Sequence, residues 1–163
     1  MDTLSPSQRS KQMGRVRGKN IKPERVVRRM LHALGYRYRL HRQDLPGNPD
    51  LVSGPRKKVI FVHGCFWHQH SDLKCLDGCA PKSNTSYWGP KLRRNAERDQ
   101  QHIAALRSAG WDVFVVWECD TKSREVLEAR LTNFLDGREP RSISRSALLN
   151  VGSIEPGPGR RGW

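Results

Sequence analysis

Long hydrophobic runs are missing from this sequence. No stretch of its 163 residues approaches the about 18 consecutive apolar residues that a transmembrane helix requires. The stretch MDTLSPSQRSKQ at the N-terminus contains no apolar signal region. Cysteines are also few, and the four present are expected to stay reduced inside a cell, which favours metal binding over disulfides. We therefore expect a cytoplasmic protein that does not associate with a membrane.

Acidic residues are scarce as well. The chain has 16 Asp and Glu against 30 Lys and Arg, so its net charge is +14 and its pI is about 10.4. Residues 1–43 hold twelve Lys or Arg and only two acids. Such a surplus predicts a polyanionic partner, and nucleic acid before a membrane surface. The alternative is a soluble basic protein without that partner.

Composition divides the chain into three regions. Residues 1–19 are basic without an apolar period, and they are expected to form an arm that orders on a phosphate backbone or, alternatively, a solvated tail. Residues 20–137 alternate between helical and strand patterns and predict one α/β domain. Residues 138–163 are rich in Ser, Pro, Gly and Arg and are expected to form a flexible tail.

Apolar residues at helical spacing predict three helices in this domain. The first begins at Pro23 and stops at Gly35, because proline favours the first helical position and glycine the position after the end. The second covers 88–109, with Pro90 in its first turn, and the third runs from a Ser123 cap to Gly137. Their expected inner positions are Val27, Met30, Leu31 and Leu34, then Leu92, Ala96, Ile103 and Leu106, then Leu127, Leu131, Phe134 and Leu135.

Four segments are typical of strands, namely 36–40, 51–52, 57–62 and 111–117. Asp50 directly precedes the second of them and follows the turn cluster LPGNP. An antiparallel pairing of the second and third strands would bring Asp50 close to the end of the third. Carboxylate oxygen is the hard donor that Mg²⁺ prefers, so Asp50 is a candidate ligand. The alternative is a turn residue after Pro49.

The stretch VIFVHGCFWHQHSDLKC, residues 59–75, starts as a buried strand and ends in metal-binding side chains. Cys65, His70, Cys75 and Cys119 form a set of N and S donors that suits Zn²⁺. The spacing Cys-x4-His-x4-Cys differs from that of common zinc fingers, and Cys79 competes with Cys75 as the third ligand. Asp72 and His68 are weaker competitors. The alternative is a group of reduced cysteines in the core.

Two histidines of this stretch are left over as candidates for catalysis. His63 and His68 could orient or deprotonate a water, because a histidine titrates near neutral pH. Each could equally be structural. Glu24 is the only acid in residues 3–43, and its simplest interpretation is an acid that complements the N-terminus of the first helix.

Three large aromatic side chains, Phe66, Trp67 and Trp88, stand outside the periodic apolar faces. Core packing is the usual role of such residues. Beside a basic surface, however, they are suited to wedge between base steps, and a mismatched step costs least to open. The polar side of the second helix, which includes Lys91 and Asn95, is a plausible surface for DNA.

The motifs LPGNPDLV, VIFVHGCFWHQH, PKSNTSYW, NAERD and GWDVFVVWEC together resemble the very-short-patch-repair (Vsr) mismatch endonucleases, over roughly residues 8–136. The resemblance implies a restriction-endonuclease-like fold, in which helices flank a central mixed sheet and a zinc ion is structural. It also implies a bacterial, nucleoid-associated enzyme that uses Mg²⁺ to nick one strand 5′ to the thymine of a T·G mismatch. Such mismatches arise when 5-methylcytosine deaminates.

The resemblance assigns roles residue by residue. Asp50 would be the metal-binding carboxylate, His68 the general base or water-positioning group, His63 a supporting group and Glu24 an outer-shell or assisting acid. Phe66, Trp67 and Trp88 would form the intercalating wedge, and the arm around Met13 would reach the minor groove. Lys91 and Asn95 would read bases, and zinc would be held by Cys65, His70, Cys75 and Cys119.

The sequence departs from restriction-type nucleases in lacking Glu-x-Lys, because the corresponding strand ends in Phe61-Val62-His63. Val62 replaces a hydroxyl residue of some relatives, so it would bind the metal through its backbone carbonyl. The expected partner is double-stranded DNA with a T·G mismatch, together with mismatch-repair proteins, and we expect a monomer. Two alternatives stay open, a restriction-type nuclease that cuts both strands and a non-catalytic zinc DNA-binding module.

Overall fold

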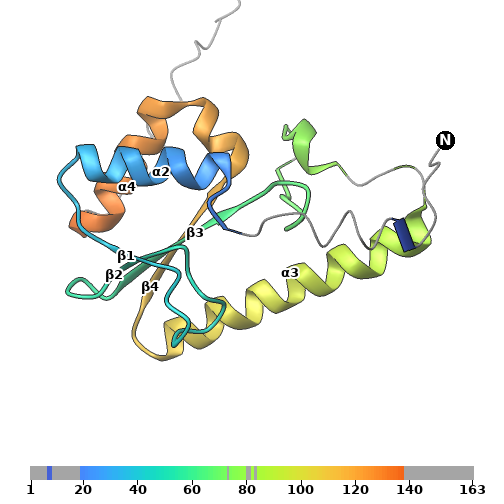
Figure 1. Ribbon diagram of the computed structural model, residues 1–163, viewed down its shortest axis with the longest axis horizontal. Helices are drawn as coiled ribbons and strands as arrows, with labels where there is room; N and C mark the ends of the chain where they lie inside the picture. The colour runs from blue at the N-terminus through green and yellow to red at the C-terminus, as the bar shows by residue number, and fades with distance from the viewer. Residues whose placement is uncertain (1–6, 9–18, 73, 80–81, 83, 138–163) are drawn as a thin grey trace, which may run out of the picture.

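A computed structural model describes residues 7–8, 19–72, 74–79, 82 and 84–137. Most of the predicted arm, including Met13, and the whole predicted tail lie outside the described residues. A four-stranded mixed sheet forms the centre of the described part (Figure 1). Its strands, in sheet order, are β1 (Arg39–Leu40), β2 (Leu51–Ser53), β3 (Lys58–His63) and β4 (Asp112–Trp117). No helix in the described ranges is long and apolar enough to cross a membrane.

The first three strands are antiparallel neighbours, whereas β3 and β4 run parallel. A tight turn suffices between β2 and β3, but a parallel pair needs a long crossover. The chain supplies it with α3 (Thr85–Ser108) between β3 and β4. The register places Leu51 opposite Ile60, and this pairing positions the residues just before β2 beside the end of β3.

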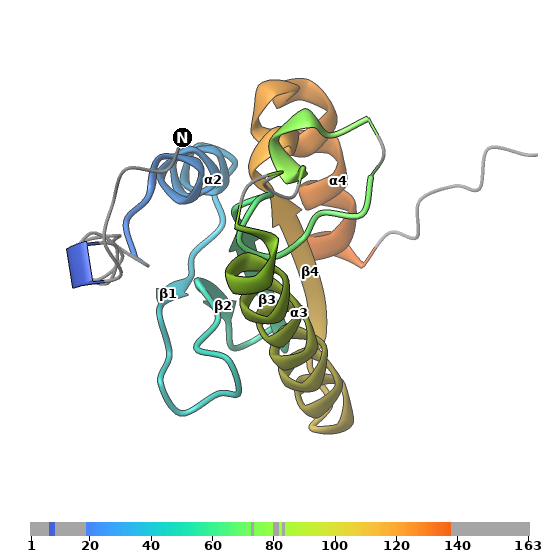
Figure 2. The same ribbon diagram turned by 90° about the vertical axis from the view of Figure 1, so that its right-hand side faces the viewer.

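Helices cover both faces of the sheet (Figures 1 and 2). On one face, α2 (Lys22–Ala33) and α4 (Arg124–Asp136) pack against alternate strand residues such as Leu51, Ile60 and Val62. On the other face, Ile103 and Leu106 of α3 pack against the intervening residues, which include Val52, Val59 and Phe61. Because side chains alternate along a strand, the two apolar clusters lie on opposite sides of one sheet.

The predicted helices are present with shifted ends. Leu34 was expected in the buried stripe, but it is the C-cap of α2 and is 37% exposed. Helix α3 begins at Thr85 and not at residue 88, so Pro90 lies in its second turn. A proline there removes a single backbone hydrogen bond near the end of a long helix, which the helix tolerates. Ser123 precedes α4 as predicted, but its side chain makes no capping hydrogen bond.

The first strand is shorter than predicted. Only Arg39 and Leu40 pair with β2, because β2 itself has three residues. The preceding tyrosines are held by side-chain contacts with helices instead of by the sheet. Tyr36 donates a hydrogen bond to Asp136 of α4 (2.8 Å), and Tyr38 donates one to the Arg28 carbonyl of α2 (2.9 Å). The prediction of a strand over 36–40 was therefore wrong for its first three residues.

Candidate active site and metal centre

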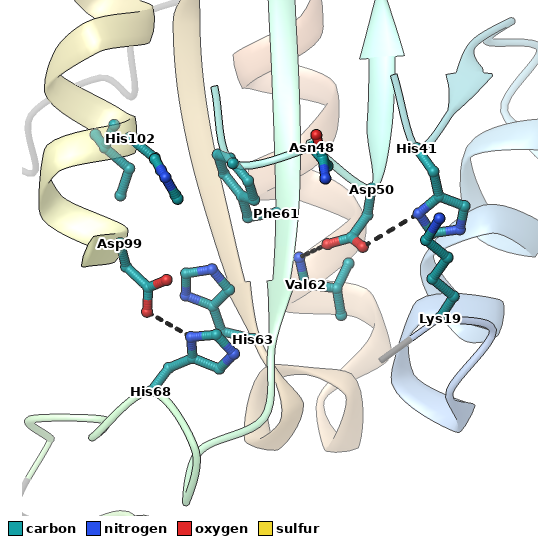
Figure 3. Close-up of a pocket in the computed structure, with 12 residues that line it drawn as sticks. Lys19, His41, Asn48, Asp50, Phe61, Val62, His63, His68, Asp99 and His102 are labelled. Atoms are coloured by element: carbon teal, nitrogen blue, oxygen red, sulfur yellow. Dashed lines mark hydrogen bonds and ion pairs between the residues drawn. The ribbon is translucent and has the colours of Figure 1, made fainter. Parts of the chain in front are cut away.

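A cavity of about 250 Å³ opens where β2 begins and β3 ends (Figure 3). Six of the ionisable side chains that line it are Lys19, His41, Asp50, His63, His68 and Asp99. Gly47 and His102 close one wall, and Gly47 has φ +75°. A Cβ at Gly47 would lie 2.8 Å from Nδ1 of His102, so this close approach requires glycine.

Asp50 is positioned by the register of β2 and β3. Its Oδ2 accepts a hydrogen bond from the Val62 backbone N–H (2.7 Å). Its Oδ1 lies 3.7 Å from Nδ1 of His41, beyond hydrogen-bond distance. In a strand, the N–H and C=O of one residue point to the same side, so the Val62 carbonyl also opens toward Asp50. One carboxylate oxygen and one carbonyl oxygen are thus available at the cavity.

These two oxygens fit a hard divalent cation such as Mg²⁺, which prefers carboxylate and carbonyl ligands. Burial is the main cause that raises the pKa of Asp50 to about 6, and the nearby Glu24 carboxylate adds to it. The Val62 N–H and the cationic side chains nearby act in the opposite direction. Without a cation, ionisation of Asp50 therefore destabilises the folded protein. The two oxygens are suited to binding a cation that would offset this charge.

His68 and Asp99 form the second polar pair of the cavity. Nδ1 of His68 lies 2.5 Å from Oδ2 of Asp99, which belongs to α3. The His68 ring also stacks on His63, with centroids 4.0 Å apart and planes at 8°. His63 is buried, and burial followed by the His68 charge lowers its pKa to about 4. At neutral pH the His63 ring is therefore uncharged, and Asp99 orients the His68 ring.

Glu24 is connected to this site through His41. Although it lies in the first turn of α2, its side chain is 1% exposed and pairs with Arg28 of the same helix. Its Oε1 lies 2.9 Å from Nε2 of His41, whose other nitrogen faces Asp50. Glu24 does not line the cavity, but one of its oxygens lies within 4.8 Å of donor atoms of His41 and Asp50, so it could act on Asp50 through His41, through its charge or as a ligand of a shared cation. Its predicted assisting role stays a prediction.

The four predicted zinc ligands come together where the loop of residues 64–70 begins and ends. One donor atom from each of Cys65, His70, Cys75 and Cys119 lies within 4.8 Å of the others, whereas Cys79 is outside this cluster. Nδ1 of His70 is 3.4 Å from Sγ of Cys119, and its ring stacks on Trp117. Burial, followed by the neighbouring thiols, raises the pKa of Cys119 to about 12. The donor set fits a soft cation that would displace the thiol protons.

The three predicted wedge residues form one aromatic cluster. Phe66 contacts Trp67 and Trp88 with ring centroids 5.0 and 5.4 Å apart, and the two tryptophans are 5.9 Å apart. All three are partly exposed. Nζ of Lys91 lies over the rings of Trp67 and Trp88, at 5.9 and 5.7 Å from their centroids. Lys91 therefore packs on the aromatic cluster, and it also borders the groove described next.

Asn95 makes contacts within the protein. Its Nδ2 donates a hydrogen bond to the Trp67 carbonyl (3.2 Å), and its Oδ1 accepts one from Arg98 (2.9 Å). It also borders a shallow basic groove along α3 together with Lys91, Arg94 and Arg98. Its amide thus ties the loop that carries Trp67 to α3, while base reading by Asn95 and Lys91 stays a prediction.

Comparison with known proteins agrees with this arrangement. Residues 1–74 match the family described as DNA mismatch endonuclease Vsr. The type II nicking enzyme V.XorIIP of Xanthomonas oryzae is 53% identical over 83% of this chain and 97% of its own length. The DNA mismatch endonuclease Vsr of Escherichia coli is 36% identical over 77% of this chain and 79% of its own length. The chain belongs to the Vsr family.

The predicted restriction-endonuclease-like fold of this Vsr-family chain is also confirmed. The catalytic domain of the homing endonuclease I-Bth0305I matches 73% of this chain and 98% of its own length with a TM-score of 0.50. At 18% identity, this likeness concerns the fold alone. The mixed sheet with helices on both faces is the restriction-endonuclease-like architecture that the motifs predicted.

Sequence reasoning missed several residues of this Vsr site. Asp99 lies in the NAERD motif, four residues after Asn95 and thus on the same side of α3, so helical spacing was a usable signal. His41 and His102 carried no signal, since neither stands in a motif or a periodic pattern. Lys19 was counted only as part of the basic arm, although it lines the cavity.

Proposed function

We propose that the protein nicks one strand of double-stranded DNA on the 5′ side of the thymine in a T·G mismatch, by Mg²⁺-dependent hydrolysis of a phosphodiester. Membership of a family of DNA mismatch endonucleases supports the reaction class. The net charge of +14 supports a DNA substrate. The mismatch and the metal ion are part of the proposal.

One observation carries this proposal, namely that a single short loop contributes both to the aromatic cluster and to the cavity. His68 lines the cavity beside Asp99, while Phe66 and Trp67, two residues and one residue earlier, belong to the aromatic cluster. A base step opened by the cluster would therefore hold a nearby phosphate close to Asp50 and His68. Opening costs a few kcal/mol at a paired step and least at a mismatch, while stacking returns about 1–3 kcal/mol per base.

Asp50 and the Val62 carbonyl would hold the Mg²⁺ ion. When bound, Mg²⁺ polarises the phosphate and stabilises negative charge on the departing oxygen. A neutral His68 that donates its Nδ1 proton to Asp99 carries a lone pair on Nε2. This nitrogen takes a proton from the attacking water. The water oxygen bonds to phosphorus as the bond between phosphorus and O3′ breaks, O3′ takes a proton from solvent, and the 5′-phosphate stays on the downstream strand.

Zinc, held by Cys65, His70, Cys75 and Cys119, has a structural role in this proposal. Four protein ligands leave no open position for a substrate. The cluster ties the loop to Cys119, which follows β4, and thereby anchors the segment that carries Phe66, Trp67 and His68.

A nicking assay tests the proposal. Two end-labelled duplexes are compared, one with a T·G pair in a cytosine-methylation site and one fully paired, each with Mg²⁺ and without it. We expect one nick, 5′ to the thymine, only in the mismatched duplex and only with Mg²⁺. Asp50→Ala should abolish it. The variant Asp112→Ala is a suitable control, because that carboxylate is 68% exposed at the far end of β4.

Other outcomes would select one of the two alternatives. Cleavage of both strands in the paired duplex would indicate a restriction-type nuclease. Tight binding without cleavage in any sequence context would indicate a zinc DNA-binding module. We further propose that the enzyme acts as a monomer and that residues 1–19, with Met13, contact DNA beside the mismatch; mismatch-repair proteins are additional proposed partners.

A further inference from the structure

The cavity around Asp50 has an uneven distribution of charge. Asp50 and Asp99 contribute carboxylates and four histidines contribute rings, but Lys19 is the only lysine or arginine among the described residues that line it. Figure 3 shows Lys19 beside the His41 ring, on the side of Asp50 away from His63 and His68. The Lys19 side chain thus lies across the cavity from His68, the histidine that would activate water.

The residue next to Lys19 forms hydrogen bonds with two side chains of α2. The Asn20 N–H donates a hydrogen bond to Oε2 of Glu24 (2.6 Å), and Oδ1 of Asn20 accepts one from Arg28 (2.7 Å). Asn20 has φ +59°, a left-handed conformation that asparagine adopts more readily than most residues. Glu24 is 1% exposed, so the residue that follows Lys19 is tied to a buried side chain, although Lys19 and Asn20 are themselves exposed.

The end of β3 has no such cation. Restriction-type nucleases place a lysine on the corresponding strand, but here the strand ends in Phe61-Val62-His63. The His63 ring is buried, stacked on His68 and in edge contact with Trp117. This strand therefore leaves the phosphate without a fixed positive side chain, although negative charge must develop on the non-bridging oxygens during the reaction.

We propose that Lys19 is a catalytic residue that binds a non-bridging oxygen of the scissile phosphate and replaces, from the N-terminal segment, the lysine missing from β3. Glu24 acts in this scheme as a positioning residue, because it holds the backbone of Asn20. The inference rests on the proposed strand nicking and adds to it. It also explains why a buried acid is kept in a segment whose other charges are all basic.

The experiment compares Lys19→Gln with a matched loss of charge, Lys22→Gln. Lys22 is exposed at the start of α2, three residues away, and does not line the cavity. Single-turnover nicking of the T·G duplex is measured at saturating enzyme with Mg²⁺. The dissociation constant is measured by fluorescence anisotropy without Mg²⁺, and thermal unfolding verifies that each variant is folded.

We expect Lys19→Gln to lower the single-turnover rate about 10²- to 10³-fold, as removal of one transition-state donor typically does. Its dissociation constant should change no more than that of Lys22→Gln, within about fivefold, as for one phosphate contact. Lys19→Arg keeps the charge and should recover part of the rate. Glu24→Gln, which loses its charge but can still accept from Asn20, should slow nicking less than Lys19→Gln.

Equal rates for Lys19→Gln and Lys22→Gln would overturn the inference, and so would a loss of binding by Lys19→Gln with an unchanged rate at saturation. In both cases the wild-type enzyme still nicks, and the proposed function stands. A wild-type protein that does not nick the T·G duplex at all would instead overturn the proposed function, and this inference with it.

Discussion

Asp50→Asn should stabilise the protein in the absence of Mg²⁺, although it removes the proposed metal ligand. Asparagine has the same shape, and its side-chain oxygen can still accept the hydrogen bond from the Val62 N–H. What the substitution removes is a negative charge in a site that is 17% exposed and close to Glu24. The folded protein then no longer bears the cost of ionising Asp50.

The magnitude follows from the pKa of Asp50, which rises from 3.8 to about 6 on folding, mainly because of burial. One pKa unit corresponds to about 1.4 kcal/mol, so the ionised form costs up to about 3 kcal/mol. Below pH 3.8 the carboxyl is protonated in both states and costs nothing. The cost grows as the pH rises from 3.8 to about 6 and is complete above it.

The assay is urea unfolding of the wild type and of Asp50→Asn at pH 4 and pH 8, in buffer without added Mg²⁺. We expect the variant to gain about 1–3 kcal/mol at pH 8 and only about 0.5 kcal/mol at pH 4. The control Asp112→Asn, at an exposed position, should change stability little at either pH. The same gain at both pH values, or no gain at pH 8, would refute the reasoning. Added Mg²⁺ should then stabilise the wild type more than the variant.

Three further substitutions test other parts of the site. Asp99→Asn weakens the contact with His68 and should slow single-turnover nicking about 10²- to 10⁴-fold while duplex binding persists; equal loss of binding would indicate a structural role instead. Cys119→Ala should abolish stoichiometric zinc, measured by elemental analysis, and lower the melting temperature; a variant that keeps one zinc per chain would contradict the ligand set. In a competition assay, Trp67→Ala should weaken binding of the T·G duplex by about 1–3 kcal/mol but leave binding of the paired duplex almost unchanged. Equal losses for the two duplexes would contradict a role of Trp67 in recognising the mismatch.

Features with a local cause could be predicted from the sequence. The stripe of Val27, Met30 and Leu31 is buried as its helical spacing predicted, and β3 is buried along nearly its whole length. The exceptions are at the ends of elements. Leu34 is exposed because the helix stops before it, and Thr85 begins α3 although Pro90 suggested a later start. End positions depend on the next packed element as much as on residue type.

The four members of the Cys/His cluster are those that the sequence analysis named, although spacing alone left Cys75 and Cys79 as alternatives. Three of its members come from one loop, and their residue types alone suggested a soft cation. The position of Cys119 beside Cys65, 54 residues earlier, follows from the parallel pairing of β3 and β4, which brings the ends of both strands to one edge. Of the two candidates, Cys75 belongs to the cluster because the loop folds that way.

The amino-acid sequence by itself determined the basic character, the helices and strands, the family and most of the reactive side chains. Only the tertiary structure decided which of them face one another. The pairing of His68 with Asp99, 31 residues away, the link from Glu24 through His41 to Asp50, and the position of Lys19 at the cavity depend on contacts between distant segments. The raised pKa of Asp50 also belongs to the folded state, since burial and neighbouring charges do not exist in an extended chain.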